Sequence, residues 1–259
     1  MNNHSLSRFM LPLVAFLTYL FLYIPIGILI LFSFNAGSTP YHWGGFTLQW
    51  YKVLFQSSEV WFALKNTLII ALSSVFLSLV MGVCYVYWSV GTYLQRLLGL
   101  FYTSVALPEI VMAVGLLSFF SFFSVPLGLT TLIAGHTLLG LGFVIPIIQT
   151  RFAELDYTLT EASLDLGATN TQTFFKIILP LLSPALVAGG LLVFILSLDD
   201  FLISFFCSGT STQTLSLYIF AMIRLGASSM INALSTLMLI ISSALVLIFC
   251  SLKLSNRVL

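Results

Sequence analysis

Residues 151–180 read RFAELDYTLTEASLDLGATNTQTFFKIILP, and this segment decides the fold because charge gathers in it while the charges in the rest of the chain lie far apart. After Arg151 it carries five charged residues, which are Glu154, Asp156, Glu161, Asp165 and Lys176. The whole chain of 259 residues has only nine basic and eight acidic side chains, and 59% of its residues are hydrophobic. A typical soluble domain is about 25% charged. The composition therefore excludes a soluble single domain.

On both sides of this segment the charges lie far apart and enclose long apolar runs. A helix needs about 20 apolar residues to cross the hydrocarbon core, where lipid offers no partners for unpaired backbone groups. An all-α integral membrane protein with six transmembrane helices is predicted, with spans at Phe9 to Phe34, Phe62 to Val90, Leu97 to Ser124, Leu127 to Thr150, Pro184 to Cys207 and Ile231 to Leu252. The third and fourth spans are expected to form a tight hairpin. The first is longer than the roughly 7 to 15 residues of a signal-peptide core, which favours a retained anchor.

The basic residues predict the orientation, because Lys and Arg are enriched in cytoplasmic segments near helix ends. If both termini are cytoplasmic, only Lys52, Lys65 and Arg224 lie outside, and the cytoplasmic set is Arg8, Arg96, Arg151, Lys176, Lys253 and Arg257. The inverted topology is the alternative. We expect residues 1–60 to form the first transmembrane helix and an outer loop, and residues 61–252 to form the main transmembrane domain. This domain includes a cytoplasmic loop at 151–183, and residues 253–259 form a cytoplasmic tail.

Two short helices are predicted in the cytoplasmic loop. Thr158 and Glu161 have the spacing of a capping box, and Gly167 suits the left-handed turn that ends many helices. Thr169 and Gln172 repeat the capping-box spacing. The second helix is expected to stop at Pro180, because proline cannot continue the hydrogen-bond ladder.

Small residues on this loop admit two interpretations. They either let the surface of another protein approach closely or pack the loop against the ends of the transmembrane bundle. The residues concerned are Ala162, Ser163, Gly167 and Ala168.

One pattern in this loop resembles the EAA loop of the inner-membrane permease subunits of ABC importers. It consists of Glu161-Ala162-Ser163, three further residues, Gly167, nine further residues and then Ile177-Ile178-Leu179-Pro180. Ser163 is the one departure, since it stands where the family has a second alanine. The resemblance implies a type I ABC importer permease bundle, of the MetI-like kind, whose loop docks on a cytoplasmic ATPase. It assigns this coupling to Glu161, Ala162, Ser163, Gly167, Leu179 and Pro180.

The chain has no P-loop of its own. A P-loop needs a lysine directly after a glycine, and none of Lys52, Lys65, Lys176 or Lys253 follows one. We therefore expect a transport subunit that is not an enzyme and holds no cofactor, with ATP bound by the partner ATPase.

Glu109 is a candidate for the substrate path, because ionisable groups at membrane depth are expensive and usually mark a pathway. It follows Pro108, which leaves backbone groups without helical partners, and it lies about halfway along the third apolar run. The alternative is a place near a helix end or a pairing with the hydroxyl of Thr103 or Ser104.

Asp199 and Asp200 are the other path candidates. Neighbouring side chains on a helix diverge by about 100°, so both cannot aim at one point. One is expected to face a cavity while the other caps a helix or pairs, with Arg224 as one conceivable partner. For the same reason the pair cannot form an aspartyl-protease dyad.

Other signals are weaker. His136 lies between glycines and is interpreted as a hydrogen-bonded helix contact, with an intramembrane serine protease built on Ser228 and His136 as the rival. No catalytic residue and no metal site are predicted. The net charge of +1 and the lack of a basic run exclude nucleic-acid binding.

Segments in the C-terminal third narrow the resemblance. Two segments are similar to the second permease subunit of bacterial spermidine/putrescine importers. They are Leu196-Ser197-Leu198-Asp199-Asp200-Phe201-Leu202-Ile203-Ser204-Phe205-Phe206 and Leu107-Pro108-Glu109-Ile110-Val111. The resemblance implies a multi-pass protein of the bacterial inner membrane that carries polyamines. It implies as partners a homologous permease, two copies of a cytoplasmic ATPase, an extracytoplasmic substrate-binding protein and membrane lipid. A permease for another small solute and an ion-driven secondary transporter are the alternatives.

Overall fold

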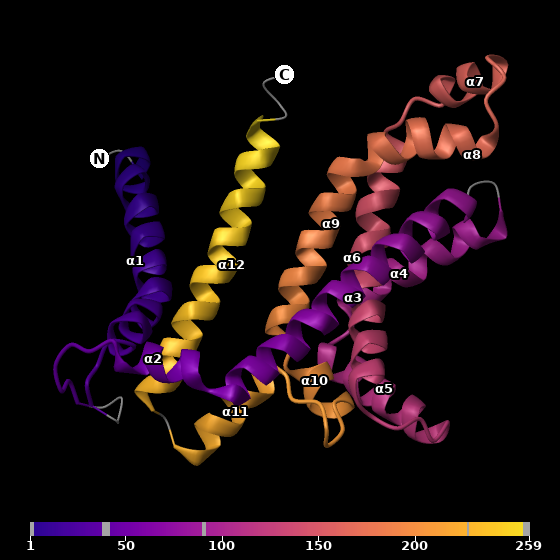
Figure 1. The fold of residues 1–259 in the computed structure, drawn as a ribbon. Helices are drawn as coiled ribbons and strands as arrows, with labels where there is room; N and C mark the ends of the chain where they lie inside the picture. The colour runs from indigo at the N-terminus through magenta and orange to yellow at the C-terminus, as the bar shows by residue number, and fades with distance from the viewer. Residues whose placement is uncertain (1–2, 38–41, 90–91, 227, 256–259) are drawn as a thin grey trace. The chain divides into compact units, whose positions relative to one another are not determined.

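The computed structural model describes residues 3–37, 42–89, 92–226 and 228–255, and these are almost entirely helical (Figure 1). Five of the described helical segments are long and apolar enough to cross a membrane, at Pro12–Phe32, Ser58–Ser89, Leu129–Ala153, Asn170–Asp199 and Ser229–Leu247. These five correspond to the first, second, fourth, fifth and sixth predicted spans. The all-α prediction is confirmed.

The third predicted span is not one continuous helix. It is divided into α4 (Leu98–Ala106), which follows the short 3-10 helix η1 (Tyr93–Leu97), and α5 (Glu109–Phe122). The break falls at Pro108, whose backbone is extended with φ −57° and ψ 130°. Proline has no N–H to donate and disfavours helical geometry in the residue before it, so the ladder ends at this point. A helix of 14 residues, at 1.5 Å per residue, is about 21 Å long, shorter than the hydrocarbon core.

The fifth predicted span is divided in the same way. Helix α9 (Leu179–Asp199) ends in an extended Asp200, and α10 (Leu202–Cys207) follows as a separate short helix. The apolar run continues through both helices, so hydropathy alone could not reveal the break.

One compact unit consists of residues 1–60 and 219–259. In it α12 (Ser229–Ser255) packs on α1 (Asn3–Phe32) and on α2 (Gln49–Gln56). The loop after α1 is organised by the buried Asn35, whose Oδ1 accepts from the N–H of Gly44 at 2.7 Å. Ser229 donates from Oγ to the carbonyl of Gly37 at 2.7 Å, which ties this loop to the start of α12.

The second compact unit consists of residues 61–218. It contains α3 (Ser58–Ser89) from Trp61 onward, α4, α5, α6 (Leu129–Ala153), α7 (Thr158–Asp165), α8 (Asn170–Thr173), α9 and α10. Helix α11 (Leu215–Leu225) begins in this unit.

The core of the second unit lies where α6 packs on α9 and α4. Val144, Ile148 and Leu182 are among its fully buried side chains. A Cβ at Gly140 of α6 would collide with the hydroxyl of Ser78 and lie 2.9 Å from a methyl of Val193. Glycine at this position therefore lets the three helices α3, α6 and α9 approach one another closely.

Candidate functional site

The predicted cytoplasmic loop is a helical hairpin formed by α7 and α8, beyond the N-terminal end of α9 (Figure 1). Gly167 makes the turn with φ +86°, as predicted. The N–H of Gly167 donates to the Leu164 carbonyl at 2.9 Å, and the N–H of Ala168 donates to the Ser163 carbonyl at 3.0 Å. These bonds satisfy carbonyls at the end of α7 and set the direction of the chain into α8.

One of the two predicted helix caps is present. Thr169 accepts from the N–H of Gln172 at 3.2 Å, and the Gln172 side chain accepts from the N–H of Thr169 at 3.0 Å, which is the expected capping box. The box at Thr158 and Glu161 is wrong, because Thr158 is already the first residue of α7. Asp156 supplies the acceptor instead, through Oδ1 at 3.0 Å from the Thr158 N–H. This backbone hydrogen bond lowers the pKa of Asp156 below its ordinary value.

The prediction that the second helix stops at Pro180 is also wrong. A π-helical stretch (Phe174–Ile178) follows α8, and α9 then begins at Leu179 with Pro180 in its first turn. The missing N–H of proline is tolerated in a first turn, and single π-turns often interrupt helices at functional sites. The loop is therefore joined to the membrane-spanning α9 by continuous helix.

The hairpin separates the motif residues into an outer and an inner group. Glu161, Ala162 and Gly167 are exposed, whereas Ser163 is buried and its Oγ lies 2.8 Å from the Oγ1 of the buried Thr173. Ser163 thus connects α7 to α8 from inside. The outer face also presents apolar side chains at Leu159, Leu164 and Leu166.

The second group of predicted site residues meets at the breaks between helices. Asp200 is 4% exposed and caps the start of α10, where the N–H of Ile203 donates to Oδ1 at 3.2 Å and that of Ser204 donates to Oδ2 at 2.8 Å. Its Oδ2 also lies 3.3 Å from Nε2 of His136 on α6. The Ser216 hydroxyl donates to the backbone carbonyl of Asp200 at 2.6 Å.

The two neighbouring aspartates have different environments, as the helical geometry predicted. Asp199, the last residue of α9, is exposed while Asp200 is buried. Glu109, the first residue of α5, is exposed, and its carboxyl interacts with that of Asp200. The structure therefore brings Glu109 and Asp200 together from two helix breaks, and Asp199 directly precedes Asp200 in the chain. We call these three residues the carboxyl cluster.

The alternative partners proposed for the acids are occupied elsewhere. Thr103 donates within its own helix to the Gly99 and Leu100 carbonyls, at 3.2 and 2.8 Å. The side chain of Ser104 lies outside the described residues. The guanidinium of Arg224 lies 4.5 Å above the ring of Phe220.

His136 is a member of the site that sequence reasoning missed. It is a hydrogen-bonded helix contact, as predicted, but its contacts lead to the carboxyl cluster. Nδ1 lies 2.8 Å from Oγ of Ser197, and Nε2 faces Asp200. The sequence did offer one signal for a shared site, because Ser197 and Asp200 are three residues apart and this spacing places two residues on one face of a helix. Nothing in the sequence relates this face to His136.

Ser197, His136 and Asp200 repeat the composition of a hydrolase triad without its accessibility. Their exposures are 4%, 1% and 4%, so no substrate carbonyl can reach the serine hydroxyl. Nδ1 of His136 lies 2.8 Å from Oγ of Ser197, and Nε2 lies 3.3 Å from Oδ2 of Asp200 without forming a hydrogen bond. No cluster of three or more metal-ligating side chains occurs in the part of the chain that the structure describes.

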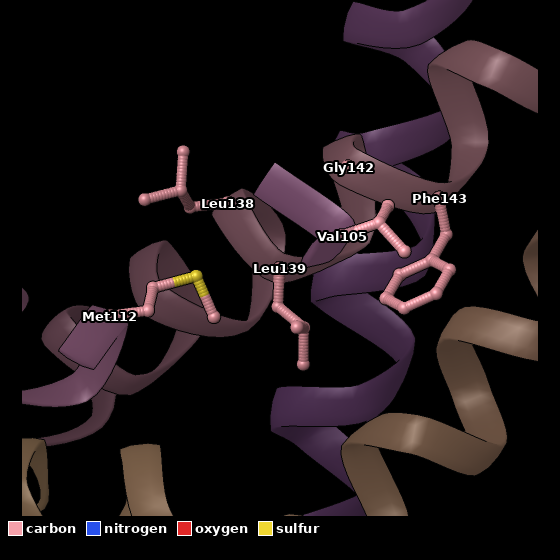
Figure 2. Close-up of a pocket in the computed structure, with 6 residues that line it drawn as sticks. All are labelled: Val105, Met112, Leu138, Leu139, Gly142 and Phe143. Atoms are coloured by element: carbon pink, nitrogen blue, oxygen red, sulfur yellow. The ribbon is translucent and has the colours of Figure 1, made fainter. Parts of the chain in front are cut away.

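A surface hollow lies on both sides of the α4–α5 break (Figure 2). The residues that line it come from α4, α5 and α6 and carry no polar side chain; they are Val105, Met112, Leu138, Leu139, Gly142 and Phe143. It offers no carboxylate to a cation, so the carboxyl cluster is the stronger candidate for a polar solute.

Comparison with known proteins tests the resemblance. Residues 74–259 match the family described as the inner membrane component of binding-protein-dependent transport systems. The chain belongs to this family. The permease is 37% identical over 249 residues to the spermidine/putrescine transport system permease protein PotC of Haemophilus influenzae, covering 94% of this chain and 96% of that protein. It is 31% identical over 256 residues to the putrescine transport system permease protein PotI of Escherichia coli, covering 92% and 89%.

Solved structures show the same fold. A bacterial ABC transporter that imports the acidic polysaccharide alginate matches with a TM-score of 0.68 and 16% identity, covering 98% of each chain. The methionine ABC transporter MetNI matches with a TM-score of 0.60 and 19% identity, over 76% of this chain and 97% of that chain. The permease therefore has the ABC importer permease fold and is an inner-membrane transport component, which excludes the serine-protease rival.

Proposed function

We propose that this permease forms the translocation path for polyamines in an ATP-driven importer of the bacterial plasma membrane. The observation that carries the proposal is the carboxyl cluster, which places three acids at helix breaks in a chain whose apolar runs are otherwise nearly free of charge. The polyamine permeases among its relatives support the same substrate class.

The charges of the cluster suit a cation. Among the described residues neither Glu109 nor Asp199 forms an ion pair with Lys or Arg, and Asp200 pairs only with His136. An ammonium group donates strong, charge-assisted hydrogen bonds to carboxylates. An acidic solute such as alginate would be repelled, so the shared fold does not imply a shared substrate.

The hairpin of α7 and α8 is the proposed dock for the ATPase. Its exposed glutamate and leucines offer a mixed polar and apolar surface, and continuous helix through Pro180 joins it to α9. Because α9 ends at the carboxyl cluster, a displacement of the hairpin would reach the substrate path through one rigid element. This connection supports a coupling role for Glu161, Ala162, Gly167, Leu179 and Pro180, with Ser163 holding the hairpin together.

The remaining features of the assembly follow from the family and from charge. We propose six membrane crossings with α4 and α5 together forming the third, and both termini in the cytoplasm. The partners are a homologous permease, two copies of the ATPase and an extracytoplasmic binding protein. The permease hydrolyses no ATP and needs no cofactor of its own, and an ion-driven mechanism is the alternative to be tested.

The test is uptake by the complete complex in liposomes, with ATP inside and the binding protein outside. Radiolabelled putrescine and spermidine should accumulate only with ATP. Glu109→Gln and Asp199→Asn should each raise KM about tenfold, the lower end of what a lost hydrogen bond to a charged group implies. Glu59→Gln is the matched control, because Glu59 is an exposed carboxylate outside the cluster, in the first turn of α3.

Two outcomes contradict parts of the proposal. Uptake of an anion or a sugar in place of polyamines would leave the family intact and refute the substrate. Accumulation driven by an ion gradient without ATP would refute the coupling role of the hairpin.

A further inference from the structure

His136 lies at the centre of a buried polar network that no transport step described above uses. The ring is 1% exposed, and its two nitrogens face groups from one neighbouring segment, Ser197 near the end of α9 and Asp200 directly after it. An ionisable side chain this deeply buried is rarely retained without specific partners. Gly135, the preceding residue, makes the arrangement possible, because a Cβ there would lie 2.7 Å from a methyl of Ile203 on α10.

The hydrogen-bonding capacities of these groups determine the direction of the network. A carboxylate only accepts, so the Nε2 that faces Asp200 carries the proton. In the neutral ring Nδ1 must then accept, and the Ser197 hydroxyl donates to it. Ser197 therefore sets the tautomer of His136 and leaves the Nε2 proton on the side of Asp200, where Nε2 lies 3.3 Å from Oδ2.

Asp200 has four favourable acceptor positions, and backbone hydrogen bonds use two of them. The N–H groups of Ile203 and Ser204 take these two, while Nε2 of His136 lies 3.3 Å from Oδ2 without forming a hydrogen bond. A remaining position can accept from Glu109 when the Glu109 carboxyl carries a proton, and the two carboxyls meet. The exposed Glu109 thus lies against a buried carboxyl that two backbone N–H groups hold and His136 faces.

We propose that His136 is a positioning residue for the substrate path, which acts through Asp200 to hold the Glu109 carboxyl where it meets the cation. Ser197 supports this role by orienting the ring. The inference rests on the proposed function, since it assumes that Glu109 contacts the polyamine. Loss of the ring leaves Asp200 with only its two backbone hydrogen bonds, so Glu109 meets a less firmly held partner while its own side chain is intact.

The test is a double-mutant cycle in the reconstituted complex, with spermidine as the probe. His136→Leu removes both ring contacts and should raise KM about tenfold with little change in Vmax. His136→Gln keeps an amide N–H that reaches Asp200, and its KM should stay within about threefold of wild type. In the Glu109→Gln background, His136→Leu should change KM less than twofold, because the group that it positions is already absent.

One control variant and three possible results test whether His136 positions Glu109. Thr137→Val is the matched control, since Thr137 lies next to His136 on α6 and its hydroxyl donates only to the Ile133 carbonyl of the same helix, at 2.6 Å. The KM of the Thr137→Val complex should equal that of the wild type. An equal rise in KM from His136→Leu in both backgrounds would overturn the inference and indicate a merely structural histidine. Equal KM values for His136→Gln and His136→Leu would overturn it as well. An unchanged KM in Glu109→Gln alone would instead refute the proposed path.

Discussion

Gly167 offers the sharpest test of the coupling hairpin, because its substitution changes backbone energy without changing contacts within the chain. Its φ is +86°, and a Cβ added there meets no atom within 4 Å. Any defect of a Gly167 variant therefore comes either from backbone strain or from a partner that approaches this surface. Two substitutions separate these causes.

The strain is calculable from the conformation. An L-residue in the left-handed region costs roughly 1–2 kcal/mol; a β-branched residue is an outlier there, whereas Asn tolerates it. Because about 1.4 kcal/mol corresponds to a factor of ten, Gly167→Val should reduce the population of the observed turn about tenfold. Escape from the strain requires breaking the bond from Gly167 to Leu164 and the bond from Ala168 to Ser163.

The assay is binding of the purified ATPase to the permease pair in nanodiscs, together with ATP-driven uptake. Gly167→Val should bind the ATPase about tenfold more weakly, while Gly167→Asn should bind within about threefold of wild type. Wild-type binding by Gly167→Val would refute the reasoning that this turn presents the dock. Equal losses in both variants would show that the added side chain itself meets the ATPase.

Three further changes test other parts of the structure. Ser163→Ala should destabilise the hairpin by about 1 kcal/mol, because it leaves the buried Thr173 hydroxyl without its partner. Hydrogen exchange in α7 should become faster, and the double variant Ser163→Ala/Thr173→Val should partly restore the slower exchange of the wild type. Gly140→Ala should lower the melting temperature of the permease through overpacking worth about 1–3 kcal/mol, with partial rescue by adding Ser78→Ala, and an unchanged melting temperature would contradict the close approach. Asp156→Ala should increase hydrogen exchange at the start of α7, whereas Asp156→Asn should not. Because folding lowers the pKa of Asp156, its contribution to the stability of α7 is complete above the unfolded pKa and disappears as pH falls through the folded pKa.

Local features of the hairpin were predictable because they depend on neighbours along the chain. The turn at Gly167 and the capping box at Thr169 are set by residues at most four positions apart, and both occur as expected. The box at Thr158 failed because two acceptors, Thr158 and Asp156, compete to start one helix, and their local signals are nearly equal. At Pro180 the general rule against proline in helices was overridden by a π-turn, which pattern reasoning does not foresee.

The helix breaks were only half predictable. Pro108 is a visible signal, and the structure divides the third apolar run at that position. The break at Asp200 carries no proline or glycine. It depends on the Asp200 side chain capping α10 and on His136 facing it, and these interactions exist only when α6, α9 and α10 are packed together.

The sequence by itself determined that this is a membrane-embedded helical permease with a polar coupling loop, because burial in lipid and capping depend on composition and on short spacings. Tertiary structure alone decided which aspartate is buried and which is exposed, and that His136 belongs to the carboxyl cluster. The physical reason is distance along the chain: His136 and Ser197 are 61 residues apart, and no periodicity relates residues on different helices. Only the packing of those helices, through glycines that allow close approach, places the histidine beside the acids.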